Sequence, residues 1–304
     1  MFPPVLPLDP APRAPRHWPA WCAIGLAWLL AQLPWAVQRG LGTALGELLR
    51  LGLRARRKVA LRNLQLCLPE LDPDAHRRLL RAHFRALGVG LFEFMRAWWG
   101  RLTPMRRSAR IEGLQALERL RASGRGVLLV SGHFTTLELC GRLLCDHVPV
   151  AGMYREHDSP ALEWAVKRGR LRYAPAMFTR QELRGAVRHL RSGGVLWYAP
   201  DQDMRGKQTV FASFFGIDAA TITATHQLAR LSGAAVVPFF HRREGGRYVL
   251  RLGDPLADFP SGDEAADGAR VNAAIEAMVR EAPAQYLWIH RRFKRRPAGQ
   301  PAVY

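Results

Sequence analysis

Residues 126–146 read GVLLVSGHFTTLELCGRLLCD, and this stretch decides the fold class. The run GVLLVS at 126–131 is short, apolar and bounded by glycines, which is typical of a buried strand. Residues 135–146 have the apolar spacing of a helix. A buried strand followed directly by a helix is the repeating unit of an α/β fold.

The same alternation continues along the chain. Strand-like apolar runs recur at 149–154, 194–199, 234–240 and 247–252. Helical patterns cover 73–100, 159–170, 180–192, 219–232 and about 263–282. Strands that alternate with helices in this way indicate a mostly parallel sheet flanked by helices.

An apolar segment near the N-terminus predicts a membrane helix. Residues 18–37 read WPAWCAIGLAWLLAQLPWAV and contain no charged side chain. A helix of about twenty such residues can cross the hydrocarbon core of a bilayer, although Pro34 would bend or end its last turn. An interfacial or buried helix is the main alternative, and a cleaved signal peptide is a weaker one.

The charge pattern indicates orientation and partners. The chain has 45 Lys and Arg against 25 Asp and Glu, a formal charge of +20, and a basic cluster, LRARRKVALRN, begins at residue 53. Positive residues that follow a membrane segment stay on the cytoplasmic side and bind anionic lipid. We therefore expect a disordered tail at 1–17, a membrane helix at 18–38 and a cytoplasmic domain at 39–304. No nucleic-acid-binding motif accompanies the charge, so a nucleic-acid partner is not expected.

The spacing of His133 and Glu138 suggests acid–base chemistry. Five positions separate them, and on one continuous helix they would lie roughly 140° apart. His133 is therefore expected in the loop after the strand, with Glu138 in the first turn of the helix. The carboxylate would hold one imidazole nitrogen and leave the other as a general base. The alternative is structural, because residues 135–138 also fit a capping box.

Long sequence blocks resemble the secondary acyltransferases of lipid A biosynthesis, in particular the lauroyl-transferring branch. The blocks are RRKVALRNLQLCLPE (56–70), VSGHFTTLEL (130–139), MYREHDSPALEWAVKRGRLR (153–172), WYAPDQD (197–203), TVFASFFGIDAATITATHQLARLSGAAVVP (209–238) and APAQYLWIHRRFKRRP (282–297). The resemblance covers nearly the whole chain. It departs from the family pattern at Met204–Lys207, where the family has an aromatic residue or His followed by Gly-Pro.

This resemblance implies an activity and a location. The donor would be an acyl chain on acyl carrier protein, and the acceptor a hydroxyl of a 3-hydroxyacyl chain on a Kdo-bearing lipid A precursor. The enzyme would act at the bacterial inner membrane with its domain facing the cytoplasm, and would need no cofactor or metal. Acyl transfer to another glycolipid or to a glycerolipid is the alternative.

The resemblance also implies roles for single residues. His133 would be the general base, Glu138 its partner, and Arg170 a cation near the charge that develops on the thioester. Arg155 and Arg168 are candidate substrate-binding residues.

Other candidates have open alternatives. Asp201 of the Asp201-Gln202-Asp203 sequence is expected to orient substrate or to be structural, because two carboxylates alone are a weak metal signal. The basic C-terminal residues could bind acceptor phosphates or anchor the tail on anionic lipid; they are His290, Arg291, Arg292, Lys294, Arg295 and Arg296. The aromatic residues at 211, 214 and 215 could belong to the core or to an acyl groove.

Overall fold

The computed structural model describes residues 10–203 and 208–304. The predicted departure from the family pattern at Met204–Lys207 lies outside these residues, and so does most of the predicted tail. Within that tail, Pro15–His17 form a short 3₁₀ helix (η1).

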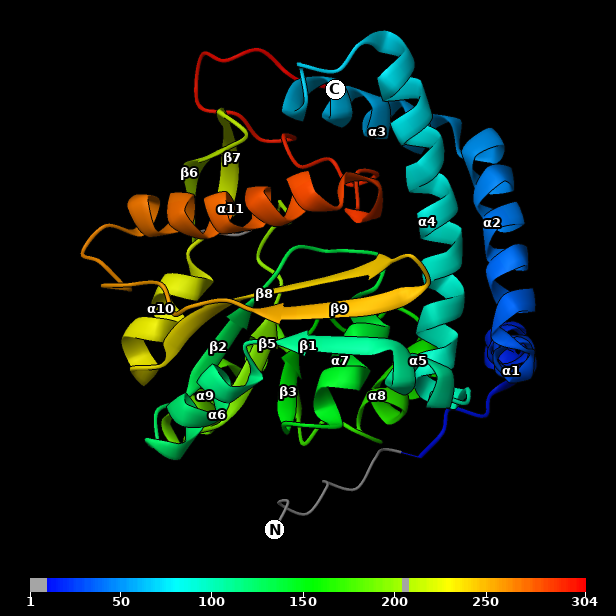
Figure 1. The fold of residues 1–304 in the computed structure, drawn as a ribbon, viewed down its shortest axis with the longest axis horizontal. Helices are drawn as coiled ribbons and strands as arrows, with labels where there is room; N and C mark the ends of the chain where they lie inside the picture. The colour runs from blue at the N-terminus through cyan, green and yellow to red at the C-terminus, as the bar shows by residue number, and fades with distance from the viewer. Residues whose placement is uncertain (1–9, 204–207) are drawn as a thin grey trace.

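A mixed seven-stranded sheet forms the centre of the molecule, as predicted (Figure 1). Its order is β1-β9-β8-β2-β5-β3-β4, and every neighbouring pair is parallel except β8 with β9. The strands are β1 (Ala109–Glu112), β2 (Val127–Val130), β3 (Val150–Met153), β4 (Met177–Phe178), β5 (Val195–Tyr198), β8 (Ala235–Glu244) and β9 (Arg247–Leu252).

Helices cover both faces of this sheet. They are α1 (Trp18–Gln32), α2 (Trp35–Gly52), α3 (Arg54–Cys67), α4 (Pro73–Trp99), α5 (Thr103–Ser108), α6 (Leu114–Ala122), α7 (Leu137–Cys145), α8 (Pro160–Arg170), α9 (Leu183–Arg191), α10 (Ala224–Ser232) and α11 (Glu264–Glu281), with 3₁₀ turns η2 (Arg180–Glu182) and η3 (Pro283–Gln285).

The strand β2 separates two hydrophobic cores. Leu128 and Val130 belong to a core shared with α3, α4, α9, α10 and α11. Val127 and Leu129 belong to the opposite core, shared with α5, α6, α7 and α8. Side chains alternate between the two faces of a strand, so a continuous apolar run is the pattern required of a strand covered on both sides.

The predicted helix at 219–232 is wrong in its first part. Residues Ile217–Ile222 form strand β7, which pairs antiparallel with β6 (Thr209–Phe214). Phe215 and Gly216 join the strands with φ angles of 53° and 72°. Positive φ at both central residues is the conformation of a tight hairpin turn, which the apolar pattern did not reveal. The helix α10 begins only at Ala224.

The helix predicted over 18–38 is divided at Pro34, where the sequence indicated that the last turn would bend or end. The helix α1 ends at Gln32, and α2 begins at Trp35, with Pro34 as its N-cap. Proline disfavours a helical conformation in the preceding residue, and Leu33 is extended. The buried Gln38 amide donates to the carbonyls of Leu30, Ala31 and Leu33 and so satisfies the end of α1. Across residues 10–203 and 208–304, no helix combines the length and the apolar character needed to cross a bilayer.

The helix α2 instead packs along α4, which lies beside it in Figure 1. Gly42 and Gly46 of α2 face Gly88 of α4, and a Cβ at Gly46 would lie 2.3 Å from the Phe84 carbonyl oxygen. The two backbones can approach this closely only because these positions lack side chains. The domain boundary expected after residue 38 therefore falls inside a helix that is packed on the α/β body.

Candidate active site

His133 lies in the loop between β2 and α7, as predicted from the sequence. The backbone of this loop is held by the segment after α11. The Leu287 N–H donates to the His133 carbonyl at 2.9 Å, and the Thr135 N–H donates to the Gln285 carbonyl at 2.8 Å. A residue so constrained has its side chain placed before any substrate arrives.

Asp201 is the carboxylate that holds His133. Its Oδ1 lies 2.5 Å from Nδ1 of the imidazole, and its Oδ2 accepts the His133 backbone N–H at 2.8 Å. The contact arises because β2 and β5 are parallel neighbours, so the residues that follow both strands meet at one edge of the sheet. Nε2 of His133 makes no hydrogen bond to the part of the chain that the structure describes, and a third of the side chain is exposed. This nitrogen is available to a substrate.

The Asp201 carboxylate is ionised in this arrangement. Burial by itself would raise its pKa, but the charge of His133 and the hydrogen bonds from the His133 ring, the His133 backbone and the Tyr286 hydroxyl outweigh it, and the pKa falls to about 2. An ionised partner fixes the ring orientation and stabilises an imidazolium.

Glu138 does not contact His133, so the predicted hydrogen bond between them is wrong. Its carboxylate pairs with Arg170 at 2.7 Å and accepts from the Trp98 indole at 2.7 Å and the Tyr173 hydroxyl at 2.8 Å. Glu138 does lie in the first turn of α7 as expected, but there it faces α4 and α8. Asp201 takes the position at Nδ1 instead.

The capping box at residues 135–138 is not formed either. Thr136 is the N-cap of α7, and its side chain makes no capping bond. Its hydroxyl lies 2.9 Å from Nδ1 of the buried His241.

The Glu138–Arg170 pair is buried and charged. Burial would raise the pKa of Glu138, yet Arg170 and the two neutral donors hold it below its usual value. Burial would likewise lower the pKa of Arg170, and Glu138 raises it instead. The ion pair joins α7 to α8, and the hydrogen bond from Trp98 to Glu138 joins α4 to α7. Neither side chain lines the cavity beside His133.

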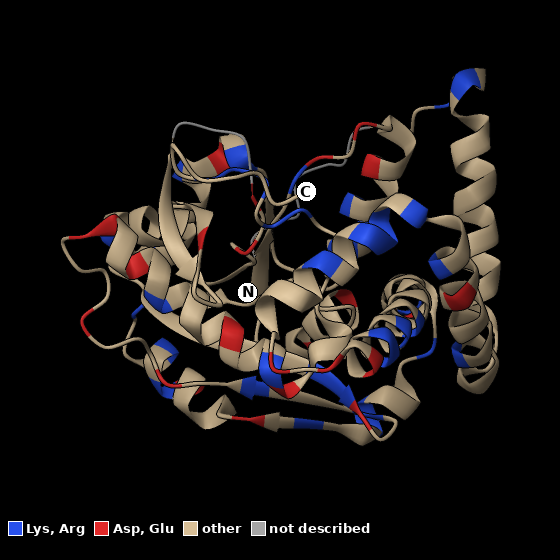
Figure 2. Ribbon diagram, turned by 90° about the horizontal axis from the view of Figure 1, so that it is seen from above, with Lys and Arg blue, Asp and Glu red and all other residues tan. Residues whose placement is uncertain are grey.

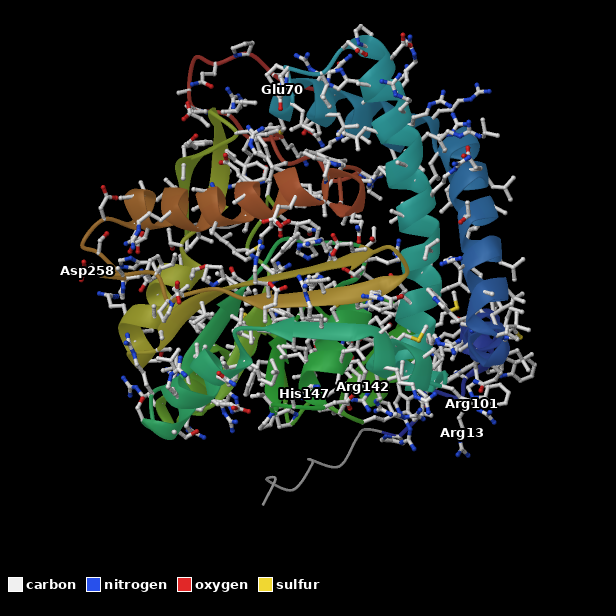
Figure 3. All side chains as sticks on the ribbon, in the orientation of Figure 1. Arg13, Glu70, Arg101, Arg142, His147 and Asp258 are labelled. Carbon is white, nitrogen blue, oxygen red and sulfur yellow. The ribbon has the colours of Figure 1, made fainter. Side chains whose placement is uncertain are left out.

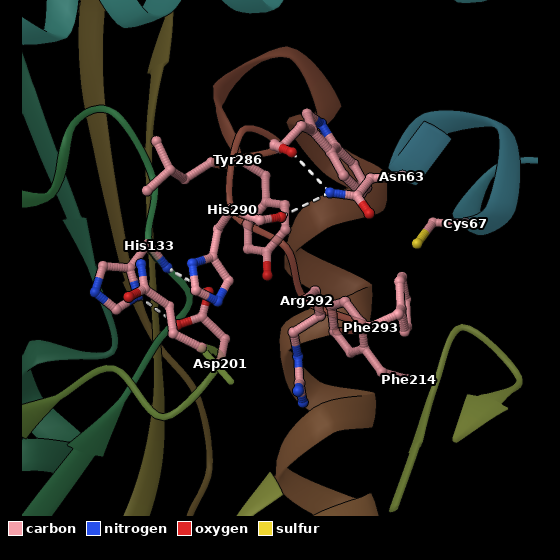
Figure 4. Close-up of a pocket in the computed structure, with 12 residues that line it drawn as sticks. Asn63, Cys67, His133, Asp201, Phe214, Tyr286, His290, Arg292 and Phe293 are labelled. Carbon is pink, nitrogen blue, oxygen red and sulfur yellow. Dashed lines mark hydrogen bonds and ion pairs between the residues drawn. The ribbon is translucent and has the colours of Figure 1, made fainter. Parts of the chain in front are cut away.

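A small cavity, partly open to solvent, lies beside His133 (Figure 4). Its lining comes from α3, the two loops that carry His133 and Asp201, strand β6 and the segment after η3. The residues are Asn63, Cys67, His133, Asp201, Gln202, Phe214, Tyr286, Leu287, Trp288, His290, Arg292 and Phe293. Sequence reasoning did not name Tyr286, and it named His290 only as a possible phosphate- or lipid-binding residue, because nothing local connects either residue to His133.

The two aspartates of Asp201-Gln202-Asp203 have different partners. Asp203 forms an ion pair with Arg295 at 2.6 Å, and its backbone N–H donates to Nε2 of His290 at 3.1 Å. Asp201 thus faces the site, and Asp203 ties the same loop to the C-terminal segment.

The four arginines predicted to bind substrate do not lie together at one site. Arg155 is exposed and pairs with Asp158, Arg168 is exposed over the Trp164 ring, and Arg291 is exposed over the Tyr304 ring. Arg292 alone lines the cavity.

The burial of Arg292 and of two phenylalanines bears on two of the open alternatives. Arg292 is 3% exposed, so it cannot anchor the tail on a lipid surface. It donates to the Ala220 carbonyl, and to Thr221 and Asn272 side-chain oxygens. Phe214 is fully buried against this cavity, whereas Phe211 is exposed.

Comparisons with known proteins agree with one another. Residues 7–295 match the family described as bacterial lipid A biosynthesis acyltransferase. The lipid A biosynthesis lauroyltransferase of Escherichia coli (strain K12) is 40% identical over 296 residues, covering 95% of this chain and 96% of that protein. The palmitoleoyltransferase of the same organism is 39% identical over 293 residues, with 95% of each chain covered. Its myristoyltransferase is 26% identical over 303 residues, covering 97% of this chain and 93% of that protein.

A search of solved structures matched the 1-acyl-sn-glycerophosphate acyltransferase of Thermotoga maritima. The match covers 83% of this chain and 99% of that one, with a TM-score of 0.40 and 15% identity.

Proposed function

The chain belongs to the bacterial lipid A biosynthesis acyltransferases, and from this we propose that it transfers a fatty acyl chain from acyl carrier protein to a lipid A precursor. The acceptor group is a hydroxyl of a 3-hydroxyacyl chain on the Kdo-bearing precursor. The relatives named as lauroyl- and palmitoleoyltransferases support the acceptor class. The net charge of +20 suits an acidic carrier protein.

The observation that carries this proposal is the His133–Asp201 pair, with Nε2 of His133 unpartnered beside a cavity. Nε2 takes the proton of the acceptor hydroxyl while its oxygen attacks the thioester carbonyl carbon. Asp201 stabilises the imidazolium. The tetrahedral intermediate then reforms the carbonyl, the carbon–sulfur bond breaks, and the proton passes from His133 to the leaving thiolate. No covalent acyl-enzyme is needed.

Glu138 and Arg170 act on this chemistry indirectly in our proposal. Their ion pair holds α7 against α8, and α7 begins four residues after His133. The pair therefore positions the loop that carries the base, rather than contacting the substrate.

We further propose that the protein acts on the cytoplasmic face of the inner membrane, with α1 and α2 lying in the interface. Large apolar side chains are exposed along both helices, namely Trp18, Leu26, Trp28, Leu29, Val37, Leu41, Leu48, Leu51 and Leu53. Figure 2 shows α1 at one side of the molecule without a charged residue along it. Arg13 and Arg101 lie near the α1 end of this surface (Figure 3). Each basic residue beside an apolar face contributes about 1 kcal/mol to the free energy of binding to anionic lipid.

The test is a transfer assay with purified full-length protein. Lauroyl-acyl carrier protein and lauroyl-coenzyme A are compared as donors, and a Kdo-bearing lipid A precursor and lysophosphatidic acid as acceptors. We expect the carrier-protein donor to be preferred, with a rate that falls as salt screens the encounter. Product from lysophosphatidic acid alone would show that the acceptor is a glycerolipid, and equal rates with both donors at low and high salt would contradict the proposed donor.

A further inference from the structure

The cavity beside His133 contains a second imidazole, that of His290. His290 follows η3 in the segment that also clamps the His133 loop. Both rings line the same cavity, and Figure 4 shows His290 beside His133 and Asp201.

The hydrogen-bond pattern fixes the tautomer of His290. The Asp203 backbone N–H donates to Nε2 at 3.1 Å. A backbone amide can only donate, so Nε2 carries the lone pair and the proton lies on Nδ1. Burial lowers the pKa of His290 more than Asp201 raises it, which keeps the ring neutral. Nδ1–H has no hydrogen-bond partner within residues 10–203 and 208–304, and it is not sealed from solvent.

Gln202 also lines the cavity with a side-chain amide, and the two arginines considered for a developing anion are largely engaged by other groups. Arg170, the cation predicted for this task, is bound to Glu138 outside the cavity. Arg292 lines the cavity, and its two terminal nitrogens donate to Ala220, Thr221 and Asn272, whereas its buried Nε–H has no partner among the described residues. No carboxylate of the described residues forms an ion pair with Arg292, so its charge adds a positive potential that favours an anion nearby.

We propose that His290 is a second catalytic imidazole, whose Nδ1–H donates a hydrogen bond to the thioester carbonyl oxygen as that oxygen gains negative charge. This inference rests on the proposed acyl transfer. The acceptor oxygen bonds to the carbonyl carbon, the carbonyl electron pair moves to its oxygen, and His133 takes the hydroxyl proton. When the carbonyl reforms, the electron pair of the carbon–sulfur bond leaves with sulfur, which receives that proton. His290 gains and loses no proton, and a neutral donor of this kind needs no reorganisation during the step.

Two matched variants separate this role from a structural one. In His290→Gln, the side-chain oxygen can replace Nε2 and keep the bond from Asp203, but no donor replaces Nδ1–H. In His290→Asn, the side-chain amide can replace Nδ1–H, but the bond from Asp203 is lost. We expect kcat of His290→Gln to fall about 10²- to 10³-fold with KM little changed. His290→Asn should keep most of the wild-type kcat.

The measurements are steady-state transfer, its pH profile and thermal unfolding on the same purified proteins, with His133→Ala as a reference. The pH dependence of kcat in His290→Gln should match that of wild type, because His290 stays neutral. An active His290→Gln with an inactive His290→Asn would show that His290 only positions Asp203. Equal losses in both variants would also overturn the proposal. Absence of transfer by the wild-type protein would contradict the proposed function itself, and His133→Ala retaining full activity would contradict its mechanism.

Discussion

His133 and Asp201 are separated by 68 positions in the chain, yet their side chains lie 2.5 Å apart. Glu138 is much nearer in sequence and makes no such contact. At the scale of single residues, the identity of the partner matters because it decides what a substitution does. Loss of Asp201 should impair the chemistry, whereas loss of Glu138 should first affect the packing of α7.

Asp201→Asn should lower kcat by about 10²- to 10⁴-fold, because the amide cannot stabilise an imidazolium and favours the wrong imidazole tautomer. A second buried pair, His226 with Asp267 at 2.7 Å, lies outside the cavity of His133 and offers a matched control. Asp267→Asn should lower the unfolding temperature while kcat of the folded enzyme is kept. Equal kcat for Asp201→Asn and wild type would rule out this assignment.

The lowered pKa of Asp201 predicts that the free energy of unfolding depends on pH in the acidic range. Its pKa of about 2 in the folded protein lies below the ordinary value of 3.8, so its contribution to stability is complete above the unfolded pKa and is lost as the pH falls through the folded one. The free energy of unfolding of wild type should therefore decline more between neutral pH and pH ~3 than that of Asp201→Asn. Denaturant titrations at both pH values measure the difference. Parallel declines would show that Asp201 is not held ionised by the fold.

Glu138→Gln should destabilise the fold by about 3–5 kcal/mol, because it leaves the buried Arg170 charge without its counter-charge. Urea unfolding gives the free energy. Arg170→Met in the same background restores neutrality, so the double variant should be less destabilised than the sum of the two single ones. Additive losses would mean that the two side chains do not act as a pair.

The contact between α2 and α4 shows what is decided at the scale of elements. Both helices are amphipathic in sequence, but their separation depends on three glycines that meet across the interface. Glu47 of α2 adds ion pairs to Arg81 and Arg85 of α4, each at 2.5 Å. Exposed pairs of this kind contribute little, so the close backbone contact is the stronger constraint.

Gly46→Ala should destabilise the protein by about 1–3 kcal/mol, because the new methyl group would overlap the Phe84 carbonyl and force the helices apart. Gly40 lies on the same helix with nothing within 4 Å of a Cβ placed there. Gly40→Ala should therefore stabilise the helix by up to about 1 kcal/mol. Thermal unfolding of the two variants gives the comparison. Similar effects at both positions would contradict close packing of α2 on α4.

At the scale of the whole molecule, the exposed apolar side chains are unevenly distributed. Among residues 10–203 and 208–304, most of the large ones lie on α1 and α2. The cavity of His133 is lined in part by α3, which follows α2 directly. A protein attached through α1 and α2 would thus hold its site close to the lipid surface that supplies the acceptor.

Trp28→Ser together with Leu29→Ser should reduce binding to vesicles containing anionic lipid by at least tenfold, since burial of each large apolar side chain contributes about 1.5–3 kcal/mol. Leu231→Ser, at an exposed apolar position on α10, is the control and should bind like wild type. Flotation with anionic and with zwitterionic vesicles, at low and high salt, separates the apolar contribution from the basic one. Unchanged binding of the double variant would show that α1 does not contact the membrane.

The sequence by itself determined the order of most elements and the family. Apolar periodicity is a local property, so strands such as Val127–Val130 and helices such as Pro160–Arg170 could be predicted to within a few residues. The position of His133 after a buried strand was fixed in the same way. The long blocks shared with lipid A acyltransferases are also a property of the sequence alone.

Only the tertiary structure decided which groups meet at the site. The partner of His133 depends on β5 lying next to β2, and the order of strands in a sheet is not encoded in the spacing of nearby residues. The C-terminal segment brings in His290 and Tyr286 for the same reason. The hairpin at Phe215–Gly216 divided a segment that the local apolar pattern had joined, whereas the break at Pro34 follows from the local effect of proline. The meeting of His133, Asp201 and His290 depends on contacts between distant parts of the chain, and those contacts exist only once the sheet has formed.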